Sequence, residues 1–139
     1  MAGIFYLDTA IWRDYFEDRK DNLRPLGEFA FRFLKNCERN GCIVLYSEAV
    51  VQELETYFSK GKVTEVFSSF TEFLREVPIS DAQISKARKI VTRIEGTHLK
   101  DALHAILARD NGAVMVARDR HFDVLVDFVE VAKPEDIHF

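Results

Sequence analysis

The hydrophobic positions of this chain alternate between short apolar runs and longer stretches with helical spacing. The first apolar run is IFYL at 4–7, and a helix is expected to follow it over Thr9–Phe16. Strand-length runs that alternate with helical patterns are typical of βαβ units. The pattern therefore predicts an α/β fold.

The clearest helical pattern lies in 26–37, where apolar residues recur at i, i+3, i+4, i+7, i+8 and i+11. Pro25 suits the first turn of this helix. Asn40 and Gly41 predict its end, because a residue that tolerates positive φ commonly follows a helix. A second strand is expected at Cys42–Tyr46.

Ser47 stands where the N-cap of the next helix is expected. Long connections of this kind favour parallel neighbouring strands with helices on both faces. We therefore expect a three-layer α/β/α sandwich with a central, mainly parallel sheet, formed by residues 1–139 as a single domain. In chain order, the remaining expected elements are helices over 47–58, 63–74, 80–94 and 99–110, a strand over 113–116, a further helix, and a last strand over about 128–131.

Composition narrows the class of protein. A hydrophobic fraction of 47% with twelve phenylalanines argues against disorder. No apolar run approaches the roughly 20 residues of a membrane span, and the N-terminus lacks a signal-peptide pattern, so a cytoplasmic protein without a membrane partner is expected. Cys37 and Cys42 lack a second pair, which favours buried thiols over a zinc site. The net charge of −4 argues against broad electrostatic capture of nucleic acid.

Two aspartates, Asp8 and Asp119, follow the apolar runs at 4–7 and 113–117 almost at once. The carboxyl ends of parallel strands meet at one edge, where open α/β folds bind ligands. An N-cap role for Asp8 and a turn role for Asp119 are the ordinary alternatives. The spacing leaves both roles open for each residue.

Two further acids, Glu53 and Asp101, lie in helices that can begin at the same edge. Glu53 borders the buried stripe of its helix, and a carboxylate there needs a partner, either a metal ion or a buried arginine. Asp101 lies in the first turns of its helix, where the helix dipole stabilises an acid in any case. Four carboxylates at one edge predict a site for a hard cation such as Mg²⁺, suited to phosphodiester chemistry.

Four segments of the chain carry a further signal, and they are IFYLDTAIW, SEAVVQEL, KDALHAILARDNGAVMVARDRHF and VAKPEDI. In these segments and in their order, the chain resembles the PIN-domain nucleases, and in particular the small VapC-type toxins. The resemblance implies a PIN-like fold in which Asp8, Glu53, Asp101 and Asp119 coordinate Mg²⁺ or Mn²⁺ and support hydrolysis of single-stranded RNA. It also implies homodimerisation and an antitoxin partner, with Thr9, Ser47 and Asp123 as secondary polar groups near the site.

Two positions depart from the family pattern. Ala117 replaces the polar residue often found two positions before the last acid, and His121 replaces the second acid of a D-x-D-F pattern. These departures put a second metal ion in question more than the first. They also keep open a non-catalytic RNA-binding or scaffold module. A phosphatase with Asp8 as nucleophile is the weaker alternative, because Ala10 stands where its second acid is expected.

Basic and aromatic residues leave further alternatives. Arg118 and Arg120 flank Asp119 and are candidates for phosphate contact or for ion pairs with neighbouring acids. A helical stripe of three basic residues suits a solvated face or RNA backbone contact. Structural roles are expected for the histidines near the site. Most of the aromatic residues between 57 and 73 are expected in the core, and some can form a dimer surface or a groove for an antitoxin helix. The basic residues are Lys86, Lys89 and Arg93, and the histidines are His98, His104 and His121.

Overall fold

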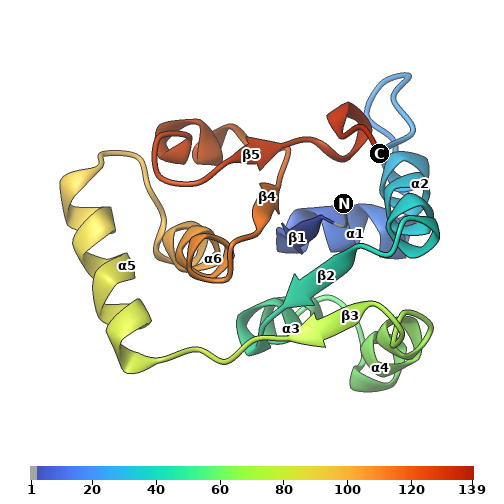
Figure 1. The fold of residues 1–139 in the computed structure, drawn as a ribbon, viewed down its shortest axis with the longest axis horizontal. Coiled ribbons are helices and arrows are strands. Elements are labelled where there is room, and N and C mark those ends of the chain that lie inside the picture. The colour runs from blue at the N-terminus through green and yellow to red at the C-terminus, as the bar shows by residue number, and fades with distance from the viewer. Residues whose placement is uncertain (1–2) are drawn as a thin grey trace.

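The centre of the protein is a five-stranded sheet in which every neighbouring pair of strands is parallel (Figure 1). The computed structural model describes residues 3–139. The strand order is β3-β2-β1-β4-β5, so β1 lies in the middle. The strands are β1 (Ile4–Leu7), β2 (Ile43–Tyr46), β3 (Leu74–Glu76), β4 (Val114–Val116) and β5 (Val131–Ala132).

Helices cover both faces of this sheet, with α1 and α2 on one side and α5 and α6 on the other (Figure 1). The three-layer α/β/α sandwich expected from the sequence is confirmed. The α-helices of residues 3–139 are α1 (Thr9–Glu17), α2 (Leu26–Arg39), α3 (Glu48–Glu55), α4 (Lys60–Ser68), α5 (Asp81–Arg93) and α6 (Leu99–Asp110). Two short 3₁₀ helices follow, η1 (Arg120–Leu125) and η2 (Pro134–Asp136).

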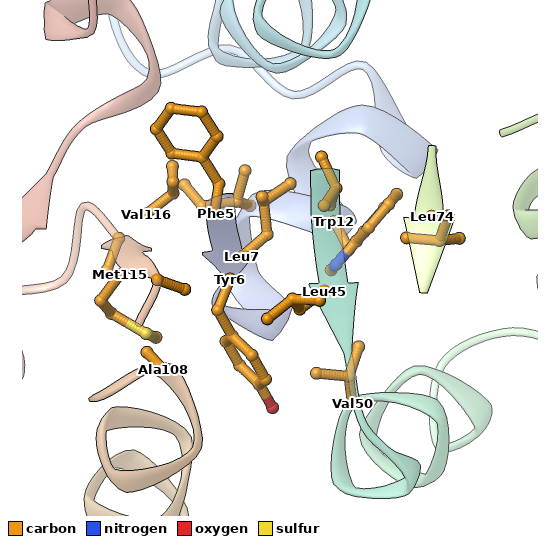
Figure 2. Close-up of a cluster of buried hydrophobic side chains, with 14 of the residues drawn as sticks. Phe5, Tyr6, Leu7, Trp12, Leu45, Val50, Leu74, Ala108, Met115 and Val116 are labelled. Atoms are coloured by element: carbon orange, nitrogen blue, oxygen red, sulfur yellow. The ribbon is translucent and has the colours of Figure 1, made fainter. Parts of the chain in front are cut away.

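Side chains of β1 alternate between the two layers (Figure 2). Phe5 packs edge-on against Phe33 of α2, with ring centroids 5.1 Å apart. Tyr6 points the other way, toward α6, where its ring centroid lies 5.5 Å from that of His104. A strand buried on both faces explains why IFYL reads as a continuous apolar run.

The expected helix over 63–74 is wrong in its second half. Helix α4 ends at Ser68, and Leu74–Glu76 forms β3, which pairs with β2 at the edge of the sheet. Turn hydrogen bonds from Phe70 N–H to Phe67 O and from Phe73 N–H to Phe70 O preserve the helical spacing of the buried phenylalanines. The helical spacing of the apolar residues therefore correctly marks which side chains are buried. Pairing with β2, however, makes the end of this segment a strand.

Smaller corrections concern boundaries. The helix expected to run to Phe58 ends at Glu55, and the last strand is Val131–Ala132 rather than about 128–131. The expected helix before it is the 3₁₀ helix η1. Gly41 follows α2 with φ of 66°, as the sequence predicts for a helix end.

Cys37 and Cys42 are both buried and free of disulfide bonds. None of the helices in residues 3–139 combines the length and the apolar surface that a membrane crossing requires.

Candidate active site

The four acids singled out by the sequence line one small cavity of about 160 Å³. Asp8 directly follows β1, and Asp119 lies three residues beyond the end of β4. Glu53 belongs to α3 and Asp101 to the first turn of α6. These segments meet because β1 and β4 are parallel neighbours that end at the same edge of the sheet.

Asp8 is the most buried of the four, with only 7% of its surface exposed. It occupies the N-cap position of α1, yet its side chain makes no capping hydrogen bond. The pKa of Asp8 is raised to about 6, chiefly by burial and further by the nearby charges of Asp101 and Glu53, against the opposing effect of His104. The carboxylate is thus held in an environment that disfavours its negative charge.

This burial predicts that Asp8→Asn stabilises the metal-free protein. Because the native pKa is above the unfolded value, the unfolded state loses its proton first, and wild-type stability falls as pH rises from about 4 to about 6. Asparagine does not titrate, so above pH 6 the variant should gain roughly 1–3 kcal/mol. Thermal unfolding in EDTA at pH 4.5 and pH 8 measures the difference. Parallel loss of stability by both proteins would contradict the prediction.

Glu53 has a partner that the sequence analysis did not name. His104, whose side chain is 1% exposed, places Nε2 2.8 Å from Glu53 Oε1. Burial alone would raise the pKa of Glu53, but the hydrogen bond and charge of His104, with the charge of Lys100, hold it below the ordinary value. Within the chain, the partner of Glu53 is therefore a histidine and not the buried arginine that was one of the two expected partners.

A buried chain of hydrogen bonds continues behind His104. Its Nδ1 lies 2.7 Å from the Tyr6 hydroxyl, which lies 2.7 Å from Ser47 Oγ. Glu53 accepts the Nε2–H of His104, and the Tyr6 hydroxyl links Nδ1 of the same ring to Ser47 Oγ. Burial raises the pKa of Tyr6, which keeps its hydroxyl protonated within this network. The network fixes the Glu53 side chain from behind.

Asp101 and Asp119 share the more open side of the cavity with His121. Its Nδ1 lies 3.2 Å from Asp119 Oδ1 and 3.7 Å from Asp101 Oδ2. Burial and the charge of Asp119 raise the pKa of Asp101 against the opposing effect of the nearby histidines. Asp119 also caps η1 by accepting the backbone N–H of His121, so the turn role left open by the sequence is present. An imidazole therefore lies where the family pattern often has a further acid.

The donor set is chemically suited to a hard cation. All four acids supply carboxylate oxygens, which Mg²⁺ and Mn²⁺ prefer. The hydroxyl oxygen of Thr9 is a further oxygen beside Glu53, and it is buried without a hydrogen-bond partner among the described residues. Within residues 3–139, however, no three His, Cys, Asp or Glu side chains are already arranged as a metal cluster. The residues fit such an ion by chemistry, while their side chains are not preassembled around it.

Other sequence-predicted residues divide into those near the cavity and those outside it. Thr9 lines the cavity with the acids. Ser47 does not line it and acts only through Tyr6, while Asp123 is exposed on η1. The family resemblance implied that these two lie beside the site, but a shared sequence pattern does not fix where a side chain points. Arg120 is exposed and is not among the cavity residues.

Arg118 forms an ion pair with an acid, which is the second of the two roles that the sequence left open for it. Its guanidinium binds Glu135 through two hydrogen bonds of 2.6 and 2.8 Å and lies 4.0 Å from Asp14. Only 13% of its side chain is exposed, so it holds the C-terminal segment to the body of the protein. The ion pair with Glu135 thus takes the place of the phosphate contact for which Arg118 was a candidate.

Three residues of the site were missed as functional candidates: His104, Arg13 and Tyr57. Arg13 and Tyr57 line the cavity, and His104 lies beneath it. The sequence could have indicated His104, because it follows Asp101 by three residues and therefore lies on the same face of the helix. Tyr57 was grouped with aromatic residues expected mostly in the core, but it is exposed.

The expected basic stripe borders a different hollow. Lys86, Lys89 and Arg93 surround an apolar groove of about 490 Å³ together with Arg109, whose guanidinium lies 4.3 Å from the Phe128 ring centroid. None of these residues lines the acidic cavity. The structure thus separates this basic surface from the four acids.

No model of a known protein family matches this chain. No curated protein matches it either.

Comparison by structure finds toxins from toxin–antitoxin systems. VapBC2 of Rickettsia felis, solved with a DNA fragment from its promoter, matches with a TM-score of 0.69 and 17% identity over 94% of this chain and 98% of the matched chain. A toxin–antitoxin complex from Klebsiella pneumoniae matches at 0.67 and 16% over 98% and 100%. VapC20 of Mycobacterium tuberculosis, described as a toxin that cleaves the sarcin-ricin loop, matches at 0.64 and 16% over 86% and 92%.

These similarities extend over nearly the whole chain. At such low identities they show a shared fold. The PIN-like architecture implied by the sequence resemblance is thereby confirmed.

Proposed function

We propose that this chain, which has the fold of the VapC-type toxins, is a metal-dependent endoribonuclease. In this proposal it hydrolyses phosphodiester bonds of single-stranded RNA and acts as the toxin of a toxin–antitoxin pair. The observation that carries the proposal is the common cavity of Asp8, Glu53, Asp101 and Asp119 at the carboxyl edge of the sheet. The similarity to a toxin described as cleaving the sarcin-ricin loop supports the choice of RNA.

Asp8, Asp101 and Asp119 are the residues proposed to hold Mg²⁺ or Mn²⁺, with Glu53 completing the set. Such an ion supplies charge neutralisation at the phosphodiester and lowers the pKa of the attacking water. The raised pKa values of Asp8 and Asp101 are consistent with a site whose carboxylates need a cation to be ionised together.

Glu53 has a distinct proposed role. Its hydrogen bond from His104 uses Oε1, which leaves Oε2 to orient a water molecule or to join the metal ligands. Its lowered pKa keeps the carboxylate ionised at neutral pH, the form needed to accept a proton. His104, Tyr6 and Ser47 position Glu53 from the buried side, as partners behind metal-site residues commonly do.

Metal removal tests the proposal directly. Labelled single-stranded RNA should be cleaved in Mn²⁺ or Mg²⁺, should remain intact in EDTA, and should be cleaved again when excess metal is restored. Mn²⁺ should also raise the midpoint of thermal unfolding of the same preparation, because an ion bound only by the native state stabilises it. Cleavage that persists unchanged in EDTA would contradict a metal-dependent mechanism.

The same assay separates the alternatives. RNA binding without cleavage in any metal would favour a scaffold or RNA-binding module, to which His121 beside Asp101 and Asp119 lends some support. A phosphatase that uses Asp8 as nucleophile is not proposed, because Ala10 lines the cavity where a second acid is needed.

An antitoxin partner is part of the same proposal. It is supported by the Rickettsia felis and Klebsiella pneumoniae structures, which are toxin–antitoxin complexes. A homodimer and a cytoplasmic location stay predictions from the sequence resemblance and composition.

A further inference from the structure

Arg13 and Tyr57 form a stacked pair at the mouth of the acidic cavity. The guanidinium carbon of Arg13 lies 3.7 Å from the centroid of the Tyr57 ring. Both residues line the cavity alongside Asp8 and Glu53, although they come from different segments, helix α1 and the turn after α3. The pair therefore borders the place where the proposed chemistry occurs.

Tyr57 is unusual among the tyrosines of this chain, because 57% of its surface is exposed while Tyr6, Tyr15 and Tyr46 are buried or half-buried. It follows the end of α3 in a turn, with its backbone N–H bonded to Leu54 O. An aromatic ring held by local backbone bonds and by Arg13, yet largely open to solvent, is available to stack on a planar ligand.

Arg13 retains hydrogen-bonding capacity beside the same cavity. One terminal nitrogen donates to Glu17 at 3.3 Å, and Nε is buried without a partner among the described residues. It is the single cation among the eight residues that line the cavity. A guanidinium presents five N–H donors and suits phosphate oxygens, so this group can contact a phosphate that the acids alone would repel.

We infer that Arg13 and Tyr57 form a nucleotide subsite for the RNA strand, with Tyr57 stacking on a base next to the scissile phosphate and Arg13 binding a phosphate oxygen. This inference rests on the proposed function and names how its substrate is held. Stacking requires a base that is not already stacked in a duplex, so the subsite selects single-stranded RNA.

The charge of the protein favours this mode of binding. The net charge of −4 argues against broad electrostatic capture of nucleic acid, and the basic surface around Lys86, Lys89 and Arg93 lies apart from the acidic cavity. A base stacked on an aromatic ring contributes affinity without adding positive charge. One arginine and one tyrosine at the cavity thus supply local contacts that the overall charge does not.

Binding of a fluorescent single-stranded RNA, measured by anisotropy in Mg²⁺, tests the subsite apart from catalysis. The full chain carrying Asp101→Asn is used so that the RNA stays intact. Tyr57→Leu should weaken binding about 5- to 100-fold, and Tyr57→Phe should bind within about twofold of the parent. Arg13→Ala should weaken binding about tenfold, with partial recovery in Arg13→Lys.

Matched controls separate the subsite from general surface effects. Arg32 is exposed and pairs with Glu28 at a spacing of four residues, the spacing that also separates Arg13 from Glu17. Phe31 is an exposed aromatic residue away from the cavity. Arg32→Ala and Phe31→Leu should each change binding by less than about twofold. Losses equal to those of Arg13→Ala and Tyr57→Leu would overturn the inference.

An abasic scan of the RNA tests the stacking without altering the fold. In the Asp101→Asn protein with Tyr57 intact, removal of one particular base should weaken RNA binding by about the same factor as Tyr57→Leu. When Tyr57→Leu is also present, removal of that base should weaken binding no further. Independent, multiplicative losses at every abasic position would overturn the inference. Cleavage by the wild type decides the proposed function, while this coupling decides the subsite, so the two can fail separately.

Discussion

Replacing Asp101 by asparagine should lower the rate of metal-dependent RNA cleavage by about a thousandfold or more. The substitution keeps the shape of the side chain but removes a carboxylate that lies beside both Asp8 and Asp119. A bound metal ion contributes several kcal/mol of transition-state stabilisation, and each roughly 1.4 kcal/mol is a factor of ten in rate. Single-turnover cleavage of labelled RNA in saturating Mn²⁺ measures the effect.

Asp110→Asn is the matched control for this prediction, because Asp110 lies in the last turn of the same helix, exposed and outside the cavity. It should cleave RNA at close to the wild-type rate. The Mn²⁺-induced rise in unfolding temperature should shrink in Asp101→Asn and persist in Asp110→Asn. Equal cleavage by wild type and Asp101→Asn would identify a contaminating nuclease and remove the support for the proposed site.

Replacing His104 by alanine should reduce both the stability of the protein and its activity. His104 is fully buried and is hydrogen-bonded to Glu53 and Tyr6. Its loss removes the hydrogen bond to Glu53 and one of the two hydrogen bonds of the Tyr6 hydroxyl, and it opens a cavity. The free energy of unfolding should fall by about 2–4 kcal/mol. Cleavage should fall about 10- to 100-fold, as it does when partners behind metal-site residues are removed. Urea unfolding and single-turnover kinetics measure the two effects.

Two variants separate positioning from general destabilisation. Tyr6→Phe removes one hydrogen bond to His104 but keeps the bond to Glu53, so it should lose stability while retaining most of the cleavage rate. His138→Ala alters an exposed histidine near the C-terminus and should change neither quantity. If Tyr6→Phe and His104→Ala lost activity in proportion to stability, a positioning role for His104 would be wrong.

Local patterns in the sequence carried most of the fold. The amphipathic spacing in 26–37 predicted α2, and continuous apolar runs predicted β1, β2 and β4, because parallel strands covered by helices are buried on both faces. The edge strand β3 was missed because its neighbours keep a helical spacing through turns. Its three residues become a strand only by pairing with β2.

The sequence alone determined that four acids belong to segments ending or beginning at one edge of a parallel sheet, since strand direction and connection length follow from local patterns. Tertiary structure decided which partners the side chains in and near the site have. His104 is hydrogen-bonded to Glu53, and Arg13 stacks on Tyr57. Arg118 forms an ion pair with Glu135. Each of these contacts joins different segments, from 17 to 51 residues apart in the chain. Local spacing shows which face of an element a side chain occupies, whereas its partner depends on which other element packs against that face.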